Sequence, residues 1–115
     1  AEPVRSEAMN VRTSTSTVGS SIVVVVEGVV DLSSIPTLHH DLLRAVRAHP
    51  GTTVVVDLDA VEALDDAGLG ILLGAAATAR EGGGDLEVVC SRAAMCERLT
   101  STRFDRAVAV QASIG

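Results

Sequence analysis

Aliphatic residues along this chain gather in short, unbroken runs. The runs at residues 22–26, 53–58 and 86–90 consist mainly of valine, leucine and isoleucine, which is typical of strands buried within a sheet. Two further segments show a weaker strand pattern. Residues 9–15 are expected to form a first strand at the edge of the sheet, and residues 107–110 a short last strand. The pattern therefore predicts a sheet whose strands are well separated along the chain.

The segments between these strands have helical spacing. The first follows Ser33 or Ser34, either of which fits an N-cap, and carries Pro36 in its first turn, where the missing N–H costs little. Its apolar face comprises Leu38, Leu42, Ala45, Val46 and His49. A second helix is expected over the alanine-rich residues 69–79, and a third, short one over residues 94–99.

The predicted order, β-β-α-β-α-β-α-β, indicates an α/β fold with a mixed sheet. Right-handed crossovers between parallel strands place the helices on one face of the sheet or on both. At 115 residues the chain is long enough for one hydrophobic core, so we expect a single domain over residues 9–115. Residues 1–8 are polar and include Pro3, and we expect them to form a flexible N-terminal tail.

The charge pattern narrows the range of functions. The net charge is −6, and all nine basic residues are arginines. An acidic chain without a basic run argues against a nucleic-acid surface, and the lack of lysine excludes a P-loop or a Schiff-base enzyme. No apolar run approaches the length of a membrane-spanning helix, and the N-terminus lacks a signal-peptide core. We therefore expect a cytoplasmic protein without membrane insertion and without a cofactor.

Cysteine and histidine give no sign of a metal site. Cys90 and Cys96 are too few for a disulfide framework, and their spacing fits no common zinc pattern. We expect free thiols, since a redox pair has no further support in the sequence. His39 and His40 are adjacent and are expected to face solvent, while His49 lies near a helix end, where it can favour the dipole.

Residues 61–70 combine charge and glycine at a junction between a strand and a helix. Asp65 or Asp66 can cap the helix, because a short carboxylate accepts orphan N–H bonds and favours the positive end of the dipole. Gly68 and Gly70, in the first turn, each cost roughly 1 kcal/mol of helix propensity relative to alanine. Such glycines indicate close approach, either by the chain's own backbone or by a partner. A well-capped helix and a docking surface both fit this stretch.

Three stretches together resemble a STAS domain: Gly28-Val29-Val30-Asp31, a strand ending Asp57-Leu58-Asp59, and Leu64-Asp65-Asp66-Ala67-Gly68-Leu69-Gly70. The branch that they resemble is the bacterial anti-sigma factor antagonists, or anti-anti-sigma factors, and the similarity runs from about residue 9 to residue 110. The resemblance implies a STAS-like mixed sheet with helices mainly on one face and a further helix after the last strand. Because the sequence stops near Ser113, we expect that final helix to be absent or truncated.

The resemblance also implies a function without catalysis. Members of this family bind an anti-sigma factor, free a sigma factor and so regulate transcription. The anti-sigma factor is also a serine kinase, and it releases the antagonist by phosphorylating the hydroxyl residue that follows the motif's aspartate. The implied partner is therefore an anti-sigma factor of the serine-kinase type.

This sequence departs from the family at the phosphorylated position. Asp65 matches the motif's aspartate, Asp66 stands at the phosphoacceptor position, and Ala67 follows where another hydroxyl is frequent. A serine kinase can phosphorylate neither Asp66 nor Ala67. Asp31 matches an acidic residue that faces the same surface in relatives, so that the three carboxylates are expected to converge on one edge of the domain. The partner-binding residues implied by the resemblance are Asp31, Ser33, Asp65, Asp66, Ala67, Gly68 and Leu69.

Two consequences of Asp66 stay open. It can act as a phosphomimetic that keeps the kinase away, or it can leave an antagonist that is always able to bind. Aspartate carries about half the charge of phosphoserine, which slightly favours unregulated binding. Ser33 and Ser34 are alternative phosphosites.

Other interpretations compete with this one. Asp57, Asp65 and Asp66 superficially resemble the Mg²⁺-binding acids of a receiver domain, but receivers carry their acidic pair after the first strand and use a lysine. A STAS domain without a phosphorylatable serine also resembles a subunit of a larger assembly, such as a lipid-transporting ABC system or a stress-signalling scaffold. The broad apolar face of the second helix, which includes Ile71 and Leu73, leaves a homodimer open.

Overall fold

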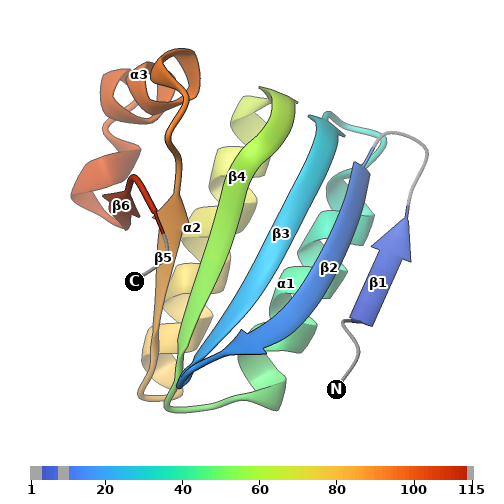
Figure 1. Ribbon diagram of the computed structural model, residues 1–115, viewed down its shortest axis with the longest axis vertical. Coiled ribbons are helices and arrows are strands. Elements are labelled where there is room, and N and C mark those ends of the chain that lie inside the picture. The colour runs from blue at the N-terminus through green and yellow to red at the C-terminus, as the bar shows by residue number, and fades with distance from the viewer. Residues whose placement is uncertain (1–3, 8–10, 114–115) are drawn as a thin grey trace.

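The computed structural model describes residues 4–7 and 11–113, with side chains from residue 11 onward. A short 3-10 helix, Phe104–Arg106, precedes the last strand. The strands and α-helices follow one another along the chain as β1 Val4–Glu7, β2 Val11–Val18, β3 Ser21–Val30, α1 Ile35–Ala48, β4 Thr53–Leu64, α2 Asp66–Glu81, β5 Asp85–Val89, α3 Ala93–Ser101 and β6 Ala109–Gln111 (Figure 1).

The strands form one sheet of six strands in the order β1-β2-β3-β4-β5-β6. β1, β2 and β3 pair antiparallel, whereas β3, β4, β5 and β6 pair parallel. The predicted α/β class with a mixed sheet is confirmed, and so is the order of elements from β2 onward.

The N-terminal segment differs from its prediction. The expected flexible tail is wrong for Val4–Glu7, because these residues pair with β2 as β1 and take the place of β2 at the edge of the sheet. Four residues are too few for a strand pattern to stand out in a sequence. Residues 1–3 and 8 of the expected tail, and residues 9 and 10 of the expected first strand, lie outside the described residues.

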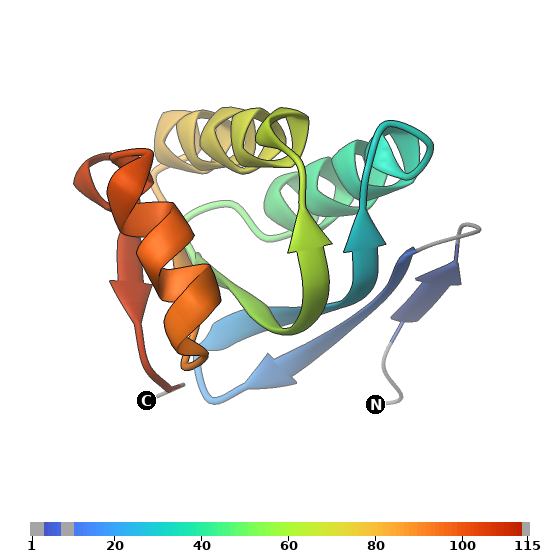
Figure 2. The ribbon, with the colours of Figure 1, turned by 90° about the horizontal axis from the view of Figure 1, so that it is seen from above.

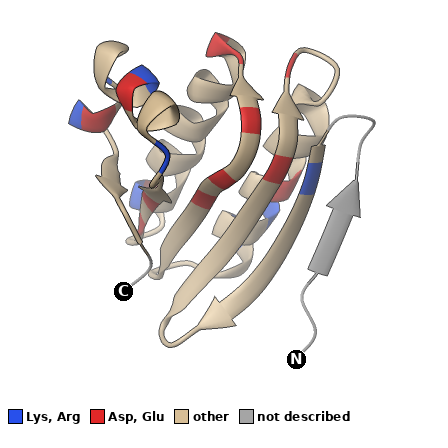
Figure 3. Ribbon diagram, turned by 45° about the horizontal axis from the view of Figure 1, so that its top comes forward, with Lys and Arg blue, Asp and Glu red and all other residues tan. Residues whose placement is uncertain are grey.

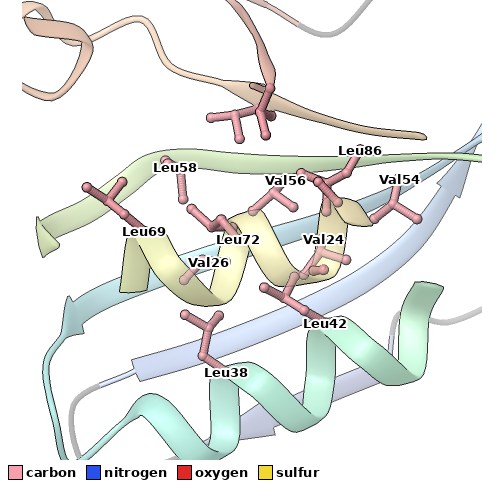
Figure 4. Packing of buried hydrophobic residues seen from close by; sticks show 14 of the residues in the cluster. Val24, Val26, Leu38, Leu42, Val54, Val56, Leu58, Leu69, Leu72 and Leu86 are labelled. Carbon is pink, nitrogen blue, oxygen red and sulfur yellow. The ribbon is translucent and has the colours of Figure 1, made fainter. Parts of the chain in front are cut away.

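Helices α1 and α2 cover one face of the sheet, and α3 lies on the side of β6 (Figures 1 and 2). Alternate side chains of β3 and β4 point toward α1 and α2. Figure 4 shows Val24 and Val56 of the sheet in one apolar layer with Leu42 of α1 and Leu72 of α2. All four side chains are at most 1% exposed, and burying each contributes roughly 1.5–3 kcal/mol to folding.

The intervening side chains of the central strands form a smaller apolar cluster. Val23, Val55 and Val89 pack together, with Val25 beside them, on the face turned away from α1 and α2. Apolar contacts on both faces explain why the aliphatic runs in β3 and β4 are unbroken. Beyond β6 the described residues Ala112 and Ser113 form no helix.

β4 is longer than its aliphatic run, because it continues past Leu58 to Leu64. Along this second half the pairing with β3 shifts register next to Gly28, whose φ of 100° lies in a region that favours glycine. Figure 2 shows the ends of β3 and β4 curving toward the helix layer. The curved strand ends carry the loop before α1 and the start of α2, where the candidate site lies.

Candidate functional site

The start of α2 is built around Asp65, which follows β4 directly. Asp65 is the N-cap residue of α2, and its Oδ1 accepts a hydrogen bond of 2.9 Å from the backbone N–H of Ala67. Its backbone oxygen accepts from Gly68 and Leu69. Of the two aspartates that the sequence allowed as caps, Asp65 takes this role and leaves Asp66 as the first residue of the helix.

Several side-chain hydrogen bonds hold the loop before α1 in shape. Asp31 Oδ1 accepts from the Ser33 hydroxyl at 2.7 Å and from the backbone N–H of Ser33 and Ser34 at 3.0 and 3.3 Å. The Ser34 hydroxyl accepts from the Asp31 N–H and lies within donating distance of the carbonyl oxygens of Val29 and Asp31. Ser34 occupies the N-cap position of α1 as predicted, but its side chain does not cap the helix.

The two loops meet at the C-terminal ends of the parallel strands β3 and β4. The backbone N–H of Asp65 donates to the carbonyl oxygen of Val30 at 2.9 Å. Asp31 and Asp66 each follow one of these two bonded residues in the chain, so the loop before α1 and the start of α2 are neighbours. Figure 3 shows acidic residues at both strand ends, at the same end of the molecule. The structure therefore brings the loop that carries Asp31 next to Asp65 and Asp66 at the start of α2, as expected from the sequence.

Gly68 is required by packing beneath this surface. A Cβ atom at Gly68 would lie 2.7 Å from Leu64 Cδ1 and 2.8 Å from Val30 Cγ1, which is too close for either contact to be retained. At Gly70 a Cβ atom would meet nothing within 4 Å. The predicted close approach is therefore confirmed at Gly68 and not at Gly70. At Gly68 the approaching groups are side chains of β3 and β4.

Burial corrects two of the expected partner contacts. Gly68 is buried, and Leu69 is 7% exposed and belongs to the main core. These two residues pack inside the domain because they lie on the side of the first turn of α2 that faces β3 and β4. The residues that reach the surface are Ser33, Asp65 and Asp66, while Asp31 and Ala67 are partly exposed.

Asp66 places an exposed charge at the start of α2. Its side chain is 85% exposed, and its Oδ1 accepts a hydrogen bond of 2.7 Å from Arg98 Nη2 on α3. A carboxylate at the first residue of a helix also faces the positive end of the dipole. Asp66 is therefore held by a surface ion pair and remains open to solvent.

Two residues of this surface, Arg98 and Leu32, were not predicted from the sequence. Arg98 was expected to lie on a short helix, but its contact with Asp66 spans 32 residues and leaves no local pattern. Arg98 also lines a depression of about 360 Å³ between β4 and α3, together with Leu64 and Met95. Leu32, beside Asp31, is 76% exposed, and an apolar residue within a loop of Asp and Ser was a signal that could have been used.

Asp57 lies apart from this site. It sits within β4, and its side chain accepts from the N–H of Asp59. Asp65 follows eight residues later, which is about 26 Å along an extended strand. Among the described residues, His, Cys, Asp and Glu side chains form no group of three that could hold a metal ion. Asp57 therefore does not lie with Asp65 and Asp66 in an acidic site like that of a receiver domain.

The mixed sheet and the loop-to-helix junction at Asp65 define a STAS domain. The family model described as "Mlab, STAS domain" matches residues 13–111, and the chain belongs to this family. No protein with a curated description matches the sequence. Within residues 4–7 and 11–113, no helix combines the length and apolarity that crossing a bilayer requires.

Solved structures of similar fold include several anti-sigma factor antagonists. An anti-sigma factor antagonist from Mycobacterium paratuberculosis is 26% identical, with a TM-score of 0.81 over 90% of this chain and 87% of that one. The antagonist SpoIIAA in its unphosphorylated form is 13% identical, with a TM-score of 0.71 over 88% and 89% of the two chains. The Bacillus cell fate determinant SpoIIAA in its phosphorylated form is 14% identical, with a TM-score of 0.65 over 88% and 92%. At these low identities the two SpoIIAA structures establish similarity of fold alone.

Proposed function

We propose that this chain is an anti-sigma factor antagonist that acts in the cytoplasm by binding an anti-sigma factor and thereby freeing a sigma factor. The observation that carries the proposal is the similarity to the mycobacterial antagonist, which extends over 90% of this chain at 26% identity. The protein acts by binding and not by catalysis, since its acidic residues serve as caps, loop contacts and a surface ion pair.

The proposed docking surface consists of the start of α2 and the loop before α1. Asp31, Ser33, Asp65, Asp66 and Ala67 form its exposed and partly exposed part. Leu32 adds an apolar side chain of 76% exposure, which a partner can cover on binding. Gly68 and Leu69 support the surface from below.

Binding through this surface is proposed to be independent of a serine phosphorylation switch. Asp66 replaces the hydroxyl residue that a serine kinase would modify, and its one negative charge compares with about −1.5 to −2 on a phosphoserine. Arg98 already lies 2.7 Å from this carboxylate, which offsets much of the local charge. Asp66 and Arg98 together therefore carry no net charge, which supports constant binding over phosphomimetic repulsion.

A kinase assay tests this proposal. The native chain, Asp66→Ser and Asp66→Ala are each incubated with the cognate anti-sigma kinase and radiolabelled ATP, and both label and complex formation are measured. We expect the native chain to bind without being labelled, Asp66→Ser to gain label at position 66 and then dissociate, and Asp66→Ala to bind without label.

Two results of that assay would contradict the proposal. Label on the native chain at Ser33 or Ser34, abolished by Ser33→Ala or Ser34→Ala, would mean that the switch has moved to the loop before α1. Failure of the native chain and of both variants to bind the kinase would contradict the antagonist function itself.

A second candidate is a non-phosphorylatable STAS subunit of a larger assembly, such as a lipid-transport ABC system or a stress-signalling scaffold. The matching family model, described as "Mlab, STAS domain", and the carboxylate at position 66 favour keeping it. Affinity purification of the chain from its native cells separates the two functions. Recovery of an ATPase subunit in place of a sigma-regulatory kinase would establish the second candidate.

A further inference from the structure

Two cysteines lie in contact at the C-terminal end of β5. Cys90 follows the last residue of β5, and Cys96 lies in the first turns of α3. Their Sγ atoms are 3.0 Å apart, and Cys96 Sγ is also 3.0 Å from the backbone oxygen of Cys90. Cys90 is 2% exposed, whereas Cys96 is partly exposed. The pair therefore joins a buried residue to a partly exposed one.

This geometry is close to that of a disulfide. A disulfide bond holds its two sulfur atoms about 2.05 Å apart, so the sulfurs need to approach each other by about 1 Å. The loop that the bond would close runs from the end of β5 into α3. We propose that Cys90 and Cys96 are a redox modification site, at which a peroxide converts the two thiols into a reversible intramolecular disulfide.

The two thiols have different roles in this reaction. Burial, together with the adjacent Cys96 thiol, raises the pKa of Cys90 to about 12, so Cys90 keeps its proton at neutral pH and is not the first to react. Cys96 Sγ attacks an oxygen of the peroxide, which breaks the O–O bond and leaves a sulfenic acid and one water. Cys90 Sγ then attacks the Cys96 sulfur, and the sulfenic hydroxyl leaves with the Cys90 proton as a second water. In total, two thiols and one hydrogen peroxide give one disulfide and two waters.

The bond would act on the candidate functional site through α3. Arg98 lies two residues after Cys96 and donates to Asp66 at 2.7 Å. A disulfide would fix the start of α3 to the end of β5 and so hold Arg98 beside Asp66. The inference does not depend on which partner the docking surface binds, because it concerns the thiols themselves.

The test compares the native chain with Cys90→Ala and Cys96→Ser during mild hydrogen peroxide treatment. For the native chain we expect loss of both titratable thiols, a mass decrease of two hydrogens, and a peptide that links positions 90 and 96. Reducing agent should restore both thiols. We also expect the melting temperature to rise by roughly 5 °C on oxidation, because a cross-link restricts the unfolded chain. Cys96→Ser should keep its remaining thiol, since Cys90 is buried.

Other outcomes would overturn the inference. Oxygen added to Cys96 as sulfinic or sulfonic acid, without a linked peptide, would show that Cys90 does not resolve the first product. Dimers linked through Cys96 would show that the exposed thiol reacts between molecules. Equal oxidation of the single thiols in Cys90→Ala and Cys96→Ser would contradict the assignment of Cys96 as the first residue to react.

Discussion

The starts of α1 and α2 lie at the same end of the sheet but use their polar groups in opposite ways. At α1 the Ser34 side chain is fully buried, and its hydroxyl contacts the carbonyl oxygens of Val29 and Asp31. At α2 Asp65 caps the helix from the surface, and Asp66 points to solvent with 85% of its side chain exposed.

The difference in burial indicates that Ser34 serves the stability of the fold, whereas Asp66 is available for contact with a partner. A buried hydroxyl that is hydrogen-bonded to the backbone of its own chain contributes to stability, and leaving its partners unsatisfied costs roughly 1–3 kcal/mol. An exposed carboxylate in a surface ion pair contributes about 0–1 kcal/mol. Asp66 can therefore change with little effect on folding, which makes it suited to contact a partner.

The largest effect is expected at the start of α1. Ser34→Ala removes the acceptor of the Asp31 N–H and should lower the free energy of unfolding by about 2 kcal/mol. Ser33→Ala, on the exposed side of the same loop, should change it by about 0.5 kcal/mol or less. Urea unfolding of the two variants measures the difference. Equal losses would mean that burial does not distinguish the two serines.

At α2 the first-turn glycines provide a matched pair. Gly68→Ala should lower the free energy of unfolding by about 1 kcal/mol or more, because the new Cβ meets Leu64 and Val30 below 3.0 Å. Gly70→Ala, which points into open space, should raise it by about 0.5–1 kcal/mol through better helix propensity. Stabilisation by both substitutions, measured by thermal unfolding, would show that the packing under α2 is loose.

At the end of β5, Cys90 should make the stability of the protein depend on pH. The pKa of Cys90 is raised from 9.0 to about 12 by burial and by the Cys96 thiol. Between these two pH values the folded chain keeps the Cys90 proton, whereas the unfolded chain has lost it. The resulting stabilisation is therefore complete below pH 9 and is lost as the pH rises toward 12. The chain has neither lysine nor tyrosine, which removes the usual alkaline titrations. Urea unfolding from pH 9 to pH 10.5 should show falling stability for the native chain and a flatter profile for Cys90→Ala; equal slopes would contradict this origin.

The two aspartates at α2 should show the smallest effects on stability. Asp65→Ala removes the N-cap bond to Ala67 and should cost about 1 kcal/mol. Asp66→Ala removes a surface ion pair and should cost about 0.5 kcal/mol or less. Chemical unfolding in low salt resolves the order of the two. A larger loss for Asp66→Ala would make this residue part of the structure and weaken its role as a docking residue.

Most of the fold follows from the sequence because the central strands and the two long helices are each defined by local pattern. The runs in β3 and β4 are buried on both faces, and the face of α1 that includes Leu38 and Leu42 repeats every turn. β1 was missed because it is four residues long and gains its stability from pairing with β2. The second half of β4 was missed because Asp59 and Glu62 interrupt its apolar residues.

The site was predictable where its contacts are local. The cap at Asp65 and the close approach at Gly68 involve short stretches of chain or the adjacent strand. The contacts of Arg98 with Asp66 and of Cys96 with Cys90 depend on how α3 packs, which no spacing in the sequence encodes.

The most direct test of the docking surface is charge reversal at the two ends of α2. Glu81 ends this helix of 16 residues, about 22 Å along the axis from Asp66, and provides a control of equal charge on the same element. Isothermal titration of the cognate anti-sigma factor with the native chain, Asp66→Arg and Glu81→Arg gives the three Kd values. We predict that Asp66→Arg weakens binding on the order of tenfold or more, about 1.4 kcal/mol, while Glu81→Arg stays close to the native value. Native affinity for Asp66→Arg would contradict the account.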